Sequence, residues 1–140
     1  MERREFLKST CTLCLLAASG ISATALSSCA SIPIYETTVH NDTLVVPVNL
    51  FSKQTIQIVR GSDLEYDIAL ERRTDGTYRA LLMECTHAHN PLTFTGNGFF
   101  CPLHGSRFDE NGEVTHGPAS MPLAELRTQT EENDVVIMLY

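Results

Sequence analysis

Short alternating runs of apolar and polar residues recur from residue 43 to the end of the sequence. Alternation with a period of two is typical of strands that bury one face. The expected strands are residues 44–48, 55–59, 66–70, 78–83, 94, 99–100, 113–114, 126–128 and 135–140. No run indicates a helix, and residues 123–127 are at most a turn. The pattern therefore predicts an all-β domain.

Turn residues separate these runs. Asp75-Gly76, Asn97-Gly98 and Asn111-Gly112 each place two residues that accept positive φ between expected strands. Such dipeptides are typical of tight β-hairpins. A polar stretch at residues 131–134 precedes the last expected strand. We therefore expect mostly antiparallel neighbours.

The first 29 residues have a different pattern. Arg-Arg-Glu-Phe-Leu-Lys at residues 3–8 is followed by an apolar and small-residue run at 11–25 and then by Leu26-Ser27-Ser28-Cys29. A basic start, an apolar middle and a small-residue end indicate an export signal. We expect residues 1–28 to be cleaved, 29–42 to be a tether and 43–140 to form one domain.

The start of this segment resembles the twin-arginine signal, which exports proteins that have already folded. Its end resembles a bacterial lipobox, which implies that Cys29 receives a diacylglycerol anchor on the periplasmic side of a membrane. Ala30, where a retained lipoprotein would have Asp, favours the outer membrane. An ordinary cleavage site and an uncleaved helix remain alternatives, although the run is short for the ~20 apolar residues of a membrane span.

The five cysteines divide into three groups. Cys11 and Cys14 lie inside the expected signal, so their Cys-x-x-Cys spacing is not interpreted as a redox or zinc pair. With Cys29 assigned to the lipid, only Cys85 and Cys101 remain. We expect no structural disulfide, and stability must come from the core and from any bound metal group.

The chain is acidic, with a net charge of −7. Removal of the signal, which carries three basic and two acidic residues, leaves about −8. This charge argues against nucleic acid as a partner. It would steer the domain toward a basic patch on a redox protein, although solubility alone also explains most surface carboxylates.

Two mixed pairs of metal-binding residues stand out in the second half of the chain. They are Cys85-Thr86-His87 and Cys101-Pro102-Leu103-His104, separated by 13 residues. Two thiolates and two imidazoles can bind one structural zinc ion or complete a two-iron cluster. Zinc sites usually combine Cys-x-x-Cys with two spaced histidines, so the mixed pairs favour the cluster.

The surrounding residues strengthen this interpretation. Cys-x-His-x-x-x-Pro-Leu at residues 85–92 and Cys-Pro-x-His-Gly-Ser-x-Phe at residues 101–108 resemble the cluster-binding loops of the Rieske [2Fe-2S] family. The resemblance covers roughly residues 43–140. It implies stacked antiparallel sheets with both loops at one tip. It also implies one [2Fe-2S] cluster per chain, with Cys85 and Cys101 on one iron and His87 and His104 on the other, near the surface.

The sequence departs from the quinol-oxidising members of that family. Asn90 and Leu103 stand where those members have a disulfide between the loops, so no bridge can form. Ser106 keeps a hydroxyl that in the family donates to a bridging sulfide, whereas Phe108 replaces a tyrosine that donates to a ligand sulfur. Fewer donors leave more charge on the cluster, so we expect an intermediate reduction potential, below that of the quinol-oxidising forms.

Other loop residues receive supporting roles from the same resemblance. Gly105 is expected to let the backbone pass close to the cluster, and Pro118 belongs to a proline-containing loop that shields it from water. His89 stands where the pattern usually has glycine. We interpret it as a solvated or supporting residue, with ligation as the alternative.

No catalytic triad, phosphate loop or acid/base pair of carboxylates is visible, so we expect no substrate of the chain's own. The leading hypothesis is a tethered, exported one-electron carrier with an unidentified redox protein as partner. The first alternative is the small Rieske subunit of an exported oxidoreductase of the arsenite-oxidase kind. The second is a zinc-stabilised lipoprotein without redox function.

Overall fold

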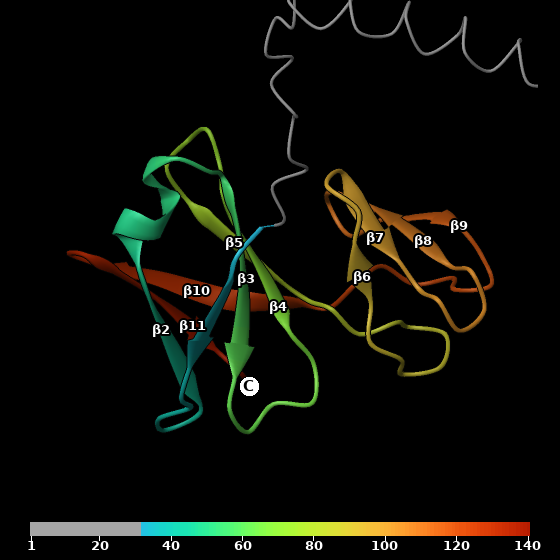
Figure 1. The fold of residues 1–140 in the computed structure, drawn as a ribbon, viewed down its shortest axis with the longest axis horizontal. Helices are drawn as coiled ribbons and strands as arrows, with labels where there is room; N and C mark the ends of the chain where they lie inside the picture. Colours follow the sequence, from blue (N-terminus) through green and yellow to red (C-terminus); the bar gives the residue numbers. More distant parts are fainter. Residues whose placement is uncertain (1–31) are drawn as a thin grey trace, which may run out of the picture. The chain divides into compact units, whose positions relative to one another are not determined.

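The computed structural model describes residues 32–140, which form one compact unit. It contains two sheets (Figure 1). The larger has seven strands in the order β1-β3-β4-β5-β10-β11-β2, and the smaller has four in the order β6-β7-β8-β9. The strands are β1 (Ile34–Thr37), β2 (Thr43–Pro47), β3 (Ile56–Gly61), β4 (Ile68–Arg72), β5 (Tyr78–Leu82), β6 (Thr93–Phe94), β7 (Gly98–Phe100), β8 (Arg107–Asp109), β9 (Val114–His116), β10 (Glu125–Glu131) and β11 (Asp134–Met138).

Three central strands, β3, β4 and β5, are buried on both faces. Val59, Ile68 and Leu70 point into a core shared with β2 and β11. Ile58, Ala69 and Leu81, on the opposite face, point into a second core, which the smaller sheet and the cysteines complete. Because successive side chains of a strand alternate between faces, the same three strands can support both cores.

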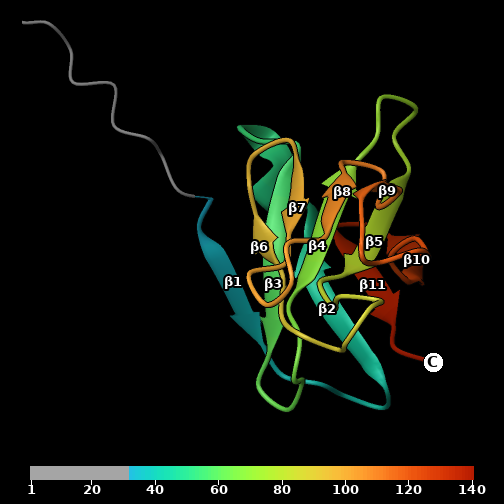
Figure 2. The same ribbon diagram turned by 90° about the vertical axis from the view of Figure 1, so that its right-hand side faces the viewer.

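The smaller sheet packs over these central strands (Figure 2). It is built from consecutive antiparallel pairs, with Phe99 opposite both Phe94 and Phe108. The hairpins expected at Asp75-Gly76, Asn97-Gly98 and Asn111-Gly112 join β4 to β5, β6 to β7 and β8 to β9. The all-β prediction is confirmed.

The structure also differs from the sequence expectations. Ile34–Thr37, expected within the tether, form β1, which pairs in parallel with β3. β8 was absent from the expected strands because it falls inside the second Cys/His motif. A short 3-10 helix, η1 (Val48–Ser52), follows β2, where no helix is expected. β10 (Glu125–Glu131) is longer than the strand expected at residues 126–128.

The expected signal, Cys11, Cys14 and the lipid-bearing Cys29 lie outside the described residues. Within residues 32–140, no helix is long and apolar enough to span a bilayer.

Candidate metal centre

Two six-residue loops carry the Cys/His pairs. Loop 1, residues 85–90, follows β5 and is closed by an isolated bridge between Glu84 and Pro91. Loop 2, residues 101–106, joins β7 to β8, where Phe100 pairs with Arg107. Each loop is therefore held at its base by antiparallel backbone pairing.

The backbones of the two loops follow the same pattern. In each loop the N–H of the first residue donates to the carbonyl of the sixth, and the N–H of the fifth donates to the carbonyl of the first. The N···O distances are 2.9 and 2.9 Å for Cys85–Asn90 and His89–Cys85, and 2.9 and 3.0 Å for Cys101–Ser106 and Gly105–Cys101. The two Cys/His motifs, which differ in spacing, thus form matching loops.

The fifth residue of each loop has a positive φ, 49° at His89 and 83° at Gly105. A β-carbon added at Gly105 would meet no protein atom within 4 Å, so the left-handed backbone, not lack of space in the protein, favours glycine there. His89 adopts this backbone despite its side chain. Its carbonyl accepts a hydrogen bond of 2.8 Å from the Tyr66 hydroxyl, and its Nδ1 pairs with the Glu84 carboxylate.

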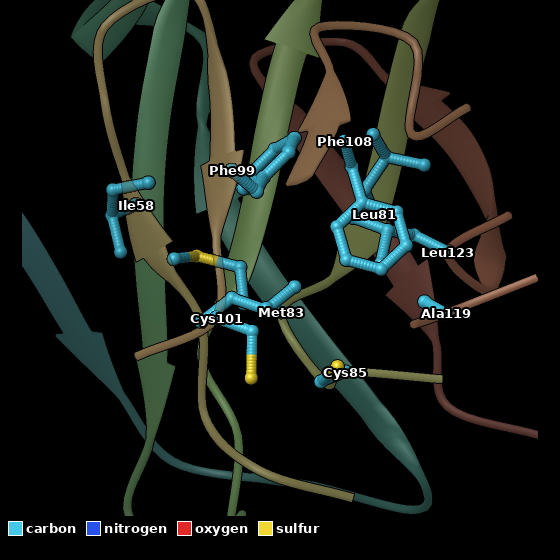
Figure 3. Close-up of a cluster of buried hydrophobic side chains, with 11 residues drawn as sticks. Ile58, Leu81, Met83, Cys85, Phe99, Cys101, Phe108, Ala119 and Leu123 are labelled. Atoms are coloured by element: carbon cyan, nitrogen blue, oxygen red, sulfur yellow. The ribbon is translucent and has the colours of Figure 1, made fainter. Parts of the chain in front are cut away.

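The four expected ligands come together as two unlike pairs. Cys85 and Cys101 are each 1% exposed and belong to the second core (Figure 3). His87 and His104 are exposed, with ring centroids 5.0 Å apart and ring planes at 78°. A buried thiol pair beside an exposed imidazole pair matches the donor set of a Rieske cluster. The ring of His89 is instead directed to Glu84 and is 80% exposed.

Within residues 32–140, no three Cys, His, Asp or Glu side chains surround one point as ligands of a single metal ion.

The environment of Cys101 determines its protonation. Burial raises the pKa of the thiol, but hydrogen bonds from the Leu103 and His104 backbone, the Asn90 side chain and Cys85 outweigh burial and lower the pKa below its ordinary value. The thiolate is the form that binds iron. The loop thus favours the binding form although the sulfur is buried.

A third segment, residues 117–121, borders both loops. Ser106 is fully buried, and its hydroxyl accepts a hydrogen bond of 3.0 Å from the Ala119 N–H. The Thr86 hydroxyl donates to the Met121 carbonyl at 2.7 Å. Ala119 is buried against the cysteines, whereas Pro118 itself is exposed. The two hydrogen bonds and the packing of Ala119 connect this segment to the loops.

Three further residues lie where the sequence departs from the quinol-oxidising pattern. Phe108 is 3% exposed in the second core and brings no hydroxyl to it. Leu103 is 52% exposed. The Asn90 side chain donates to the Pro91 carbonyl at 3.0 Å and to the Cys101 sulfur at 3.9 Å. No sequence motif marks this contact, or those of Tyr66 and Glu84 with His89, because each depends on the folded loop.

Comparison with known proteins agrees with this geometry. The model of the Rieske [2Fe-2S] domain family matches residues 41–127. The cytochrome b6-f complex iron-sulfur subunit of Nostoc punctiforme is 40% identical over 55 residues, which cover 38% of this chain and 31% of the relative. The subunit of Synechococcus elongatus is 35% identical over 77 residues, which cover 54% and 42%. The chain thus spans less than half the length of these relatives.

Solved structures show the same fold. The plasma membrane Rieske protein of Synechocystis PCC 6803 matches with a TM-score of 0.54 and 24% identity, over 67% of this chain and 97% of that protein. A complex of oxygenase and ferredoxin in carbazole 1,9a-dioxygenase has a chain that matches with a TM-score of 0.50 and 23% identity, over 71% and 95%. The expected fold and the expected cofactor are confirmed. Because the family model covers more than half of the chain, this protein belongs to the Rieske [2Fe-2S] domain family.

Proposed function

We propose that the protein carries one electron at a time through a [2Fe-2S] cluster held by Cys85, His87, Cys101 and His104. When bound, this group supplies reversible one-electron chemistry, with the electron taken at the histidine-ligated iron. The observation that supports this assignment most strongly is the pairing of buried cysteines with exposed histidines whose rings lie 5.0 Å apart.

The protein around these ligands makes the cysteine side of the centre apolar and leaves the histidine side exposed. Met83, Leu92, Phe99 and Phe108 are all buried in the core that contains the cysteines. They exclude water from the sulfur side. The histidines face solvent, so a redox partner can approach that side closely.

The reduction potential follows from the hydrogen-bond donors that loops 1 and 2 provide. Each donor to a ligand sulfur stabilises the more negative, reduced state and raises the potential. Phe108 provides no such donor, and Asn90 and Leu103 cannot form a disulfide. We therefore expect an intermediate potential within the ~−150 to +300 mV range of Rieske centres.

We further propose that the protein is exported folded and is anchored through Cys29 on the periplasmic side of a bacterial membrane, with the outer membrane favoured. The support is the twin-arginine-like start and the Leu-Ser-Ser-Cys sequence at residues 26–29. Folding before export suits a protein that receives its metal group in the cytoplasm.

The partner is proposed to be a redox protein with a basic docking patch, because the chain without its signal carries about −8. The second candidate function is that of a small subunit in an exported oxidoreductase, such as an arsenite-oxidase-like enzyme. The names of the curated relatives, which are subunits of a cytochrome complex, favour a place in an assembly.

Substitution of the histidines tests the ligand assignment. His87→Ala should abolish the near-ultraviolet and visible absorption of the cluster, because one iron loses a ligand. The matched control is His89→Ala, two residues away in loop 1, which should keep the spectrum because its ring faces Glu84. The reverse result, with loss of the spectrum only in the His89 variant, would refute the assignment.

A further inference from the structure

Asn90 occupies the same place in loop 1 that Ser106 occupies in loop 2. Both are sixth residues, and the carbonyl of each accepts a 2.9 Å hydrogen bond from the N–H of the cysteine that begins its loop. The Asn90 amide contacts the Cys101 sulfur, and the Ser106 hydroxyl contacts Ala119, which belongs to the same core as the cysteines. The Ser106 hydroxyl is fixed by the Ala119 N–H, and the Asn90 amide is oriented by the Pro91 carbonyl.

The Asn90 amide reaches across to the other loop. Its Nδ2 lies 3.9 Å from the Cys101 sulfur, a distance suited to the large sulfur atom and near the long end for such a bond. Leu103 of loop 2 is 52% exposed and has an apolar side chain that contributes no donor. An N–H···S contact to Cys101 therefore joins the loops where no disulfide can form.

We propose that Asn90 is a positioning and tuning residue that donates from its amide to the ligand sulfur of Cys101, ties loop 1 to loop 2 and raises the reduction potential of the centre. The inference depends on the proposed ligation by Cys101. A neutral N–H donor beside a ligand sulfur interacts more strongly with the reduced state, which has one more negative charge. Asn90 thus partly offsets the donor that is missing at Phe108.

The test compares Asn90→Ala and Asn90→Leu with the parent protein by redox titration of the full chain containing the cluster. Both variants remove the amide donor. We expect a threefold to tenfold lower affinity for the electron, where tenfold corresponds to ~59 mV for a one-electron couple. Asn90→Leu keeps the branched shape of the side chain without its amide, so it supplies the comparison if the alanine variant fails to assemble.

Asn97→Ala and Asn97→Leu are the matched controls. Asn97 lies in the turn before β7, at the opposite end of that strand from Cys101, and is exposed. Its variants should keep the parent potential. Unchanged potentials in the Asn90 variants, or equal shifts at both positions, would overturn the role of Asn90. A parent protein without a Rieske cluster would instead refute the proposed function.

Discussion

At the scale of single residues, the site is defined by which donors surround the sulfur atoms. Cys85 and Cys101 lie in an apolar core, so each nearby hydrogen-bond donor has a larger effect than it would have in water. Ser106 contributes a buried hydroxyl, whereas Phe108 contributes only a ring. Figure 3 shows Phe108 in the same buried cluster as Ala119 and Cys85.

Phe108→Tyr should therefore raise the reduction potential, because a phenol at this position can donate to a ligand sulfur. We expect a shift of up to ~59 mV, which is a tenfold gain in affinity for one electron. Redox titration of the purified protein measures it. Phe94→Tyr, on half-buried β6, is the control and should leave the potential unchanged. A potential that falls or stays constant in the Phe108 variant would argue against this explanation of the expected intermediate potential.

For the candidate site, the sequence predicts the residues of each motif but not the contacts between distant residues. The Cys/His motifs predicted the proposed ligand set and the family, of which the family is confirmed, because metal-ligand spacing is a local property of the chain. Contacts that join distant residues were invisible. The hydrogen bond from Tyr66 to the His89 carbonyl spans 23 positions, and that from Asn90 to the Cys101 sulfur spans 11. Both require the folded loops to exist first.

At the scale of elements, Arg79 of the larger sheet donates hydrogen bonds to the turn between β8 and β9, so the smaller sheet is held by polar contacts as well as by the apolar core. Arg79 on β5 is 10% exposed and contacts Glu71 on β4 at 2.6 Å. The same guanidinium donates to Asn111, between β8 and β9, at 2.7 Å. Alternation along β5 places Arg79 on the face that carries Leu81, toward the smaller sheet. Arg79 thereby connects β5, the strand before loop 1, to the β8–β9 hairpin, which follows loop 2.

Arg79→Met should lower the free energy of unfolding by ~2–3 kcal/mol, because Glu71 and Asn111 lose a partly buried, charged partner. Denaturant unfolding of the cluster-containing protein measures the loss. Arg73→Met is the control: Arg73 lies 3.7 Å from Glu125 with both side chains well exposed, so its loss should stay below ~1 kcal/mol. Equal losses in the two variants would show that Arg79 has no special role between the sheets.

The sequence predicted strands correctly where apolar and polar residues alternate regularly. It missed strands that lie inside a ligand motif or that form only by pairing with a distant strand. β4 and β5 follow the expected pattern around Asp75-Gly76. β8 was hidden because its residues also belong to the Cys-Pro-x-His-Gly-Ser-x-Phe motif. β1 was hidden because pairing with β3 depends on residues more than 20 positions away. Long-range pairing of this kind leaves little signal in a short segment.

At the scale of the whole molecule, the proposed anchor and the exposed histidines would together determine how the protein meets a partner. An acidic domain attached through Cys29 would diffuse along the membrane surface and present His87 and His104 to a partner. In bacterial lipoproteins more than one acyl chain gives stable attachment, because a single chain binds membranes only marginally. Loss of the modified cysteine should therefore have a large effect on location.

Cys29→Ser should move the exported protein from the membrane fraction to the soluble fraction while the cluster spectrum is kept, because the proposed cluster ligands are elsewhere in the chain. Fractionation of the producing bacterium, followed by absorption spectroscopy, measures both properties. Cys14→Ser, inside the expected signal, should leave the distribution unchanged. If the Cys29 variant stays in the membrane fraction as fully as the parent, the lipid anchor is wrong.

A redox titration followed by electron paramagnetic resonance tests the central claim most directly. We expect a reduced-state signal whose average g value lies below that of all-cysteine [2Fe-2S] clusters, appearing with one-electron behaviour and a midpoint below about +250 mV. A protein that contains zinc and gives no such signal would contradict the claim that this chain carries an electron. A midpoint above about +250 mV would contradict the intermediate potential expected from Phe108, Asn90 and Leu103.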